Sequence, residues 1–210
     1  MRDYYTIHLD EKLNVCDFNK GVSEAYTETL LKTIKIAEKL SVCVLNMHFN
    51  EGVYFTLPDK KVYLYNEYYE EYQKSLKAFR DQCTSAIDGK NIRICIENTR
   101  SFMLDFVGMG IETLLESPVF GFTFDTGHNA GSGYKQFSII ERNINRLCHM
   151  HLHDYSAEKG DHLPLGEGCL NISEYIDLAK EHGCRVLLET KTIYGVRKSA
   201  DWKKNNFWVV

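Results

Sequence analysis

The chain has 210 residues, of which 44% are hydrophobic and 26% are charged, and its formal net charge is −4. This composition is that of a soluble globular protein with one sizeable core, and no apolar run approaches the roughly 18 residues of a membrane span. The acidic total gives no electrostatic reason to expect a nucleic-acid partner, and seven cysteines without a C-x-x-C pair predict reduced packing residues in a cytoplasmic protein.

Short apolar runs that predict buried strands alternate along the chain with patterns typical of helices. The strands are expected at residues 4–9, 42–48, 92–96, 120–124, 147–152 and 185–188. The helices are expected at residues 24–40, 66–87, 101–116, 134–145, 172–182 and 198–207. Residues 10–23 and 52–65, together with the stretches after residues 128 and 160, are expected to be loops. No linker or low-complexity segment interrupts this order, so residues 1–210 are predicted to form a single domain.

Strands that alternate with helices predict a parallel α/β fold, either an open doubly wound sheet or part of a (β/α)8 barrel. Side chains that can bind a metal stand at the C-terminal end of every predicted strand: His8, His48, Glu97, Asp125, His151 and Glu189. A barrel gathers these ends into one ring, whereas an open sheet spreads them along a line too long to share one metal. We therefore predict an incomplete barrel of about six strands.

The stretch 120–128, FGFTFDTGH, illustrates this pattern most fully. Its alternating phenylalanines predict a buried strand, and the strand gives way abruptly to polar and flexible residues. Asp125 and His128 offer a carboxylate oxygen and an imidazole nitrogen, which suit zinc, manganese or iron. A capping Asp beside a surface His explains the same four residues without any metal.

Six motifs together carry a resemblance to a known family: NMHFN, ICIENT, GFTFDTGHN, HMHLHD, DHLPLGEG and VLLET. In this order they resemble the xylose-isomerase-like TIM-barrel superfamily, which includes sugar isomerases, epimerases and endonuclease IV. The family barrel has eight strands, so the resemblance implies that the first two βα units are missing before residue 4. It also implies one divalent ion, Mn²⁺ or Zn²⁺ with Co²⁺ and Mg²⁺ as alternatives. The implied ligands are Glu97, Asp125, His151 and Glu189.

The resemblance implies a divalent-metal-dependent isomerase or epimerase that acts on a small sugar or sugar phosphate. In such an enzyme the metal polarises a carbonyl, and Glu97 and Glu189 remove and return the proton on the neighbouring carbon. His153 is two residues from His151 and shares its face, so we expect it to lie behind the ligands.

Two alternative functions remain open from the sequence. Four further histidines, His8, His48, His128 and His162, resemble positions that help endonuclease IV bind up to three Zn²⁺ ions for phosphodiester cleavage, with nucleic acid as partner. The Asp that precedes the last His of that motif by two residues is Gly160 here, and Asp161 stands one position late. The second alternative is an inactive, truncated barrel that serves as a binding protein. A homo-oligomer is expected in each case, because exposed apolar strand edges favour self-association.

Overall fold

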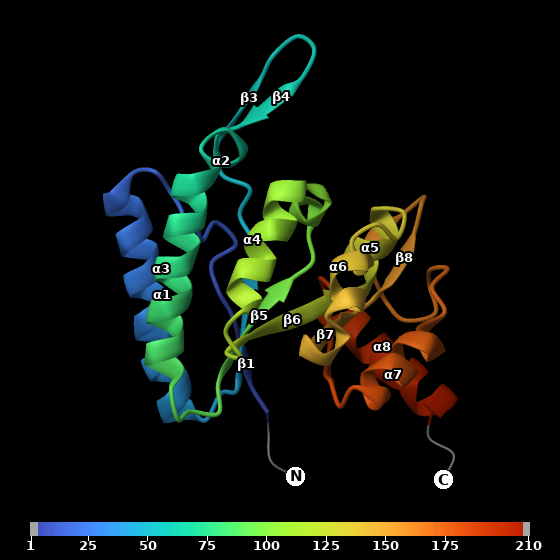
Figure 1. Cartoon of the computed structure of the whole chain (residues 1–210). Helices are drawn as coiled ribbons and strands as arrows, with labels where there is room; N and C mark the ends of the chain where they lie inside the picture. Colours follow the sequence, from blue (N-terminus) through green and yellow to red (C-terminus); the bar gives the residue numbers. More distant parts are fainter. Residues whose placement is uncertain (1–3, 208–210) are drawn as a thin grey trace. The chain divides into compact units, whose positions relative to one another are not determined.

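The computed structural model describes residues 4–207 (Figure 1). Contacts between residues divide the chain into two compact units. The first unit comprises residues 1–97 and 101–121, and the second comprises residues 98–100 and 122–210. No helix among the described residues is long and apolar enough to cross a membrane. The expectation of a single domain stays a prediction.

The first unit is built on three parallel strands, β1 (Thr6–His8), β2 (Val44–His48) and β5 (Arg93–Glu97). Its helices are α1 (Lys20–Leu40), α2 (Leu64–Glu67), α3 (Tyr69–Ile87) and α4 (Asp105–Leu115), with the 3₁₀ turn η1 (Arg100–Met103) at the unit boundary. Helices α1 and α3 lie side by side (Figure 1). They bury apolar side chains three and four residues apart, each contributing about 1.5–3 kcal/mol when fully buried.

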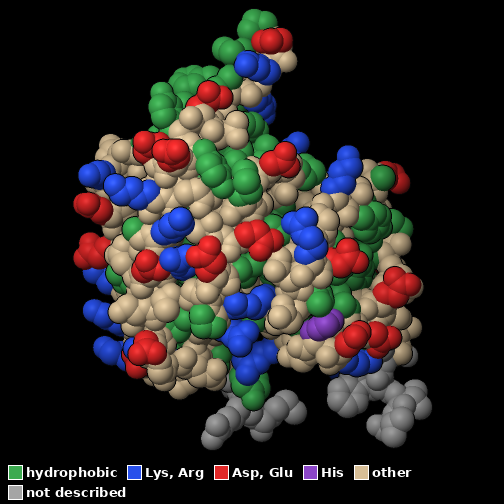
Figure 2. All heavy atoms as spheres, in the orientation of Figure 1, with side chains coloured by type: hydrophobic (Ala, Val, Ile, Leu, Met, Phe, Trp, Pro, Cys, Tyr) green, Lys and Arg blue, Asp and Glu red, His purple; other side chains and the backbone are tan. Residues whose placement is uncertain are grey.

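A β-hairpin also belongs to the first unit and extends away from its helices (Figure 1). It consists of β3 (Tyr54–Thr56) and β4 (Lys61–Tyr63), joined by a turn in which the Leu57 N–H donates to the Lys60 carbonyl at 2.8 Å. Figure 2 shows hydrophobic side chains gathered on this hairpin, and Phe55 is 56% exposed. The hairpin follows β2, so it stands after the C-terminal end of that strand.

The second unit is also built on parallel strands, β6 (Phe120–Asp125), β7 (Leu147–Leu152) and β10 (Arg185–Leu188). Its helices are α5 (Thr126–Gly131), α6 (Phe137–Arg142), α7 (Ile172–Glu181) and α8 (Ile193–Phe207), and the 3₁₀ turn η2 covers Ile144–Arg146. A second hairpin, β8 (Asp154–Ser156) with β9 (Gly160–Leu163), follows β7 directly. Helix α7 packs on β7 and β10, and α5 contacts both β8 and β9.

All six predicted strands are present and parallel, which confirms the predicted fold class of an α/β protein. The predicted loops at 52–65 and after 160 were wrong in part, because each contains a strand of a short hairpin. Helix α1 begins at Lys20 rather than at residue 24, since the Asn19 side chain accepts a hydrogen bond from the Gly21 N–H and caps the helix. The glycine-rich stretch after Asp125 forms helix α5 rather than a loop, again because its first residue is capped.

Candidate metal centre

Asp125 ends β6 and is fixed by its neighbours at both backbone and side chain. Its backbone N–H donates to Asn98 Oδ1 at 2.7 Å, and Asn98 Nδ2 donates to its carbonyl at 3.0 Å. Its Oδ1 accepts from the His128 N–H at 2.6 Å, which makes Asp125 the N-cap of α5. Asp125 and Asn98 are both fully buried. The cap predicted at Asp125 is therefore confirmed, and it uses Oδ1 rather than Oδ2.

His151 and Glu189 face this second carboxylate oxygen. In the register of the parallel strands, His151 on β7 stands opposite Asp125 on β6 and Leu187 on β10. His151 Nδ1 lies 2.6 Å from Glu189 Oε2 and 4.0 Å from Asp125 Oδ2. One imidazole nitrogen and two carboxylate oxygens thus converge from the ends of three adjacent strands. This donor set suits Mn²⁺ or Zn²⁺, so the residues present fit the expected ion.

His153 contacts the carboxylate of Asp125 directly, and its expected role behind the metal ligands stays a prediction. Its Nε2 is 3.1 Å and 2.9 Å from the two carboxylate oxygens of Asp125, and its side chain is fully buried. Burial by itself disfavours the charged imidazolium, but the hydrogen bond and the negative charge of Asp125 outweigh it. The pKa of His153 is therefore raised above its ordinary value.

His128 and His162 are brought together at the same end of the second unit. Their rings are arranged edge to face, with ring centroids 5.9 Å apart. His162 Nδ1 lies 3.2 Å from the Glu189 carbonyl oxygen. One donor atom from each of His128, Asp161 and His162 lies within 4.8 Å of the others. Asp161 therefore lies near both histidines, although it stands one position late in the sequence motif.

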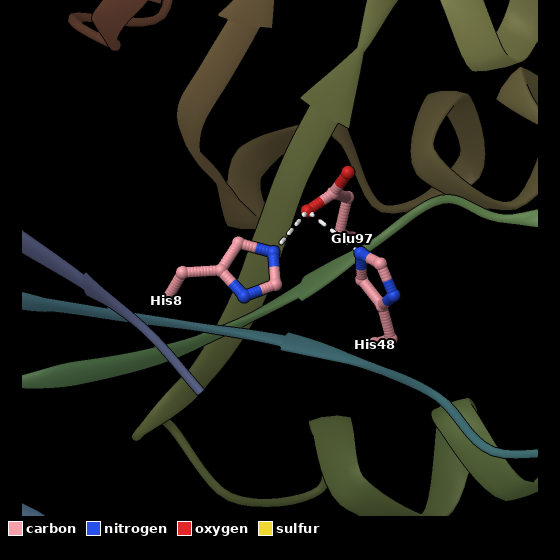
Figure 3. Close-up of side chains that lie close together, drawn as sticks. All are labelled: His8, His48 and Glu97. Atoms are coloured by element: carbon pink, nitrogen blue, oxygen red, sulfur yellow. Dashed lines mark ion pairs between the residues drawn. The ribbon is translucent and has the colours of Figure 1, made fainter. Parts of the chain in front are cut away.

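The first unit holds a cluster formed by His8, His48 and Glu97 (Figure 3). His8 Nε2 and His48 Nε2 lie 3.5 Å and 3.3 Å from Glu97 Oε2, and Asn46 Nδ2 donates to the same oxygen. Glu97 is 1% exposed, whereas His8 is exposed and His48 half-buried. The parallel register produces this cluster, because His8 stands opposite Asn46 and His48 opposite Glu97. That Glu97 also joins Asp125, His151 and Glu189 stays a prediction from the sequence.

Asp154 and Asn98 are organising residues that the sequence analysis missed. The Asp154 carboxylate is 1% exposed and accepts four backbone N–H bonds, from Tyr155, Gly166, Gly168 and Leu170, at 2.8–3.0 Å. It thereby folds the PLGEG stretch back onto β8. The only signal in the sequence was a polar residue two positions after the end of a predicted buried strand, which both Asn98 and Asp154 satisfy.

Comparison with known proteins identifies the family. The family described as xylose isomerase-like TIM barrel matches residues 3–206. The chain belongs to this family. The predicted resemblance is therefore confirmed, and with it the expected fold of an incomplete (β/α)8 barrel.

Individual relatives agree with this assignment. The uncharacterized protein MJ1311 of Methanocaldococcus jannaschii is 26% identical over 225 residues, which span 100% of this chain and 73% of that protein. A D-tagatose 3-epimerase-like protein has a similar structure, with a TM-score of 0.74 and 24% identity over 96% of this chain and 76% of its own. The IOLI protein, whose structure holds a zinc atom, has a TM-score of 0.66 and 12% identity, covering 95% of this chain and 75% of its own.

Proposed function

We propose that this protein is a divalent-metal-dependent isomerase or epimerase of small sugars or sugar phosphates. The observation that carries the proposal is the convergence of Asp125, His151 and Glu189 at the ends of three adjacent parallel strands. Two proteins of similar fold support it, because one is named as D-tagatose 3-epimerase-like and the structure of the other holds zinc. The proposed ion is Mn²⁺ or Zn²⁺, with Glu97 as its fourth ligand. When bound, it polarises the substrate carbonyl and stabilises the negative charge that develops beside it.

The two glutamates are proposed to move the proton on the carbon next to that carbonyl. Glu189 is suited to meet a substrate, because its side chain is 30% exposed while Oε2 stays 2.6 Å from His151 Nδ1. Glu97 is held in place by the Asn46 amide and by the two imidazoles of His8 and His48, which all contact Oε2. One carboxylate removes the proton as general base, and the other returns it as general acid from the opposite face.

His128 and His162 are proposed to orient the hydroxyl groups of the substrate. Their side chains are 23% and 15% exposed, so each ring keeps an accessible edge although its backbone is fixed. His128 is anchored by its N–H to Asp125, and His162 is anchored at Nδ1 against the Glu189 carbonyl. Histidines anchored in this way restrict the poses of a bound sugar, which favours proton transfer at a single carbon.

A zinc-dependent phosphodiesterase is the second candidate. Two additional donor groups favour it, namely His8 with His48 and Glu97, and Asp161 with His128 and His162. The formal net charge of −4 weighs against a phosphodiester substrate, because phosphate contacts are made by lysine and arginine. A sugar-binding protein without activity is the third candidate, and it differs only in the absence of proton transfer.

Solvent exchange distinguishes the three candidates. The Mn²⁺-loaded protein is incubated in D₂O with a panel of ketoses and ketose phosphates, and deuterium at the carbon next to the carbonyl is followed by NMR. We expect exchange and epimer formation with at least one substrate. Glu189→Gln is expected to reduce the rate by about 10²–10⁴-fold, the range typical of a general acid or base. Glu181→Gln, on the exposed surface of α7, is the matched control and should leave the rate unchanged.

A DNA duplex with one abasic site is tested in parallel with the zinc-loaded protein. Nicking of this duplex without exchange into any sugar would overturn the proposal in favour of the phosphodiesterase. Sugar binding with no exchange and no nicking would favour the binding protein instead.

A further inference from the structure

The ring of His153 is bonded at both nitrogens. Its Nε2 faces both oxygens of Asp125 at 3.1 Å and 2.9 Å, and its Nδ1 lies 2.7 Å from the backbone N of His162 on β9. The side chains of His153 and Asp125 are fully buried, so neither contact is shared with solvent. His153 therefore links the end of β6 to the β8–β9 hairpin.

The chemistry of the two contacts fixes where the ring carries its proton. A backbone N–H can only donate, so Nδ1 must accept from His162, and the proton lies on Nε2 and points to Asp125. The alternative contact, Nδ1 to the Asp154 carbonyl, is longer at 3.4 Å and would require the proton on Nδ1. Because the lone pair of Nδ1 is engaged by His162 and Nε2 donates to Asp125, neither nitrogen is available to bind a metal.

The surroundings of His153 are shaped to an imidazole ring. A Cβ atom on Gly127 would lie 2.1 Å from His153 Cε1, so only glycine leaves room for the ring at this point of α5. The His162 ring stacks on the His153 ring, with centroids 4.2 Å apart and planes 24° from parallel. Thr126 Oγ1 donates to the His153 carbonyl at 3.0 Å and holds its backbone. The close approach of Gly127, the stacked His162 ring and the bonds at both ring nitrogens thus specify the place and plane of this ring.

Asp125 depends on this ring for its orientation. The His128 N–H binds only Oδ1, and one hydrogen bond leaves the carboxylate free to turn about its Cβ–Cγ bond. The Nε2–H of His153 is a second donor at a different point, and it fixes the carboxylate plane with Oδ2 on the side of His151. Groups that donate to a metal-binding carboxylate typically change metal affinity by about 10–100-fold.

We infer that His153 is a positioning residue that aims the Asp125 carboxylate at the metal and at the same time ties the β8–β9 hairpin to that ligand. The inference rests on the proposed function, because it assigns Asp125 to the metal. It assigns two separate contributions to one ring: the bond to Asp125 supports the affinity of the protein for its ion, and the bond to His162 supports the order of the hairpin that carries Asp161 and His162.

Two substitutions separate the two bonds of His153. In His153→Gln the amide nitrogen reaches as far as Nε2 and can still donate to Asp125, but no acceptor remains for the His162 N–H. In His153→Asn the shorter amide reaches only the Nδ1 position, so it can accept from His162 and loses Asp125. Mn²⁺ affinity is measured by isothermal titration calorimetry, and hairpin order by hydrogen–deuterium exchange of residues 154–163. Thermal unfolding verifies that each variant is folded.

We expect His153→Asn to lose about 10–100-fold in Mn²⁺ affinity while the hairpin stays protected. His153→Gln should keep most of the affinity while exchange in the hairpin accelerates. Equal affinity in the wild type and both variants, or equal losses in both, would overturn the inference, because a ring that merely fills space gives no such contrast. A wild-type protein that takes up no Mn²⁺ refutes the proposed function, which is a different result.

A second measurement is made on the wild-type protein, and the variants serve only to assign its signals. Nitrogen-15 NMR of histidine-labelled protein reports which ring nitrogen carries the proton. We expect one histidine with a protonated Nε2 and an accepting Nδ1, assigned to His153 by its loss in either variant. A proton on Nδ1 of His153 would overturn the inference.

Discussion

Asp154→Asn is expected to destabilise the second unit by a predictable amount. The substitution keeps Oδ1, which accepts from Tyr155 and Leu170, and replaces Oδ2, which accepts from Gly166 and Gly168 at 2.9 Å each. Two of the four bonds are therefore lost, and an NH₂ group faces two N–H groups. A hydrogen bond to a charged group contributes about 1.5–3 kcal/mol to stability. Because Gly166 is exposed and water can replace the lost acceptor, we take about 1.5 kcal/mol for each of the two lost bonds, which gives about 3 kcal/mol.

Chemical denaturation of the two proteins measures this loss directly. For a chain of this size, about 3 kcal/mol corresponds to a fall in melting temperature of roughly 6–12 °C. Asp177→Asn is the matched control, because that carboxylate is 69% exposed and its ion pair is with exposed Lys180 on the same helix. Its effect should stay within about 0.5 kcal/mol. If Asp154→Asn cost less than about 1 kcal/mol, the four-bond account of this loop would be wrong.

Three further predictions concern other parts of the chain. Gly127→Ala should displace His153 and weaken Mn²⁺ binding in a calorimetric titration. Gly131→Ala in the same helix is the control and should bind Mn²⁺ normally, because its Cβ would lie at an ordinary 3.5 Å from Tyr155. Equal binding by the two variants would refute the argument that a Cβ at residue 127 crowds His153. At pH 8 a thiol reagent should modify exposed Cys169 in the folded protein, and Cys83 only after unfolding. The reason is that burial raises the pKa of the Cys83 thiol and removes its reactive thiolate. Comparable labelling rates of Cys169 and Cys83 in the folded protein would contradict this. Light scattering should report self-association, because among the described residues β10 pairs only with β7 and exposes Val186 and Leu187. A stable monomer at micromolar concentration would rule self-association out.

The predicted burial of β1 and β10 was wrong, because every residue of both strands is half-buried or exposed, including Val186 and Leu187 on β10. The other parallel strands were predictable because each is a largely apolar run that is ended or followed by a polar residue. That pattern depends only on burial at both faces, which short sequence windows record well. The same logic located Asp125, His151 and Glu189, because parallel strands align their C-terminal ends. Their convergence within the second unit follows from the strand register and required no knowledge of side-chain contacts.

The supporting residues were not predictable because their partners are distant in the sequence. Asn98 bonds Asp125 across 27 residues, and Asp154 reaches residues up to 16 positions away. The two hairpins escaped notice for a related reason. Their strands have only three or four residues each, which is too short for an alternating pattern to stand out. Helix α5 was hidden by its two glycines, whose low helix propensity is offset by the Asp125 cap.

Anomalous diffraction from crystals grown with Mn²⁺ tests the central claim most directly, because it locates the ion and its ligands without reference to any substrate. The account predicts one strong anomalous peak per chain, bound by Asp125, His151 and Glu189, with Glu97 as the fourth ligand. The proposal would be contradicted by an ion bound without Asp125 and Glu189. It would also be contradicted if anomalous peaks appeared only beside His8 and His48 and beside His128 and Asp161.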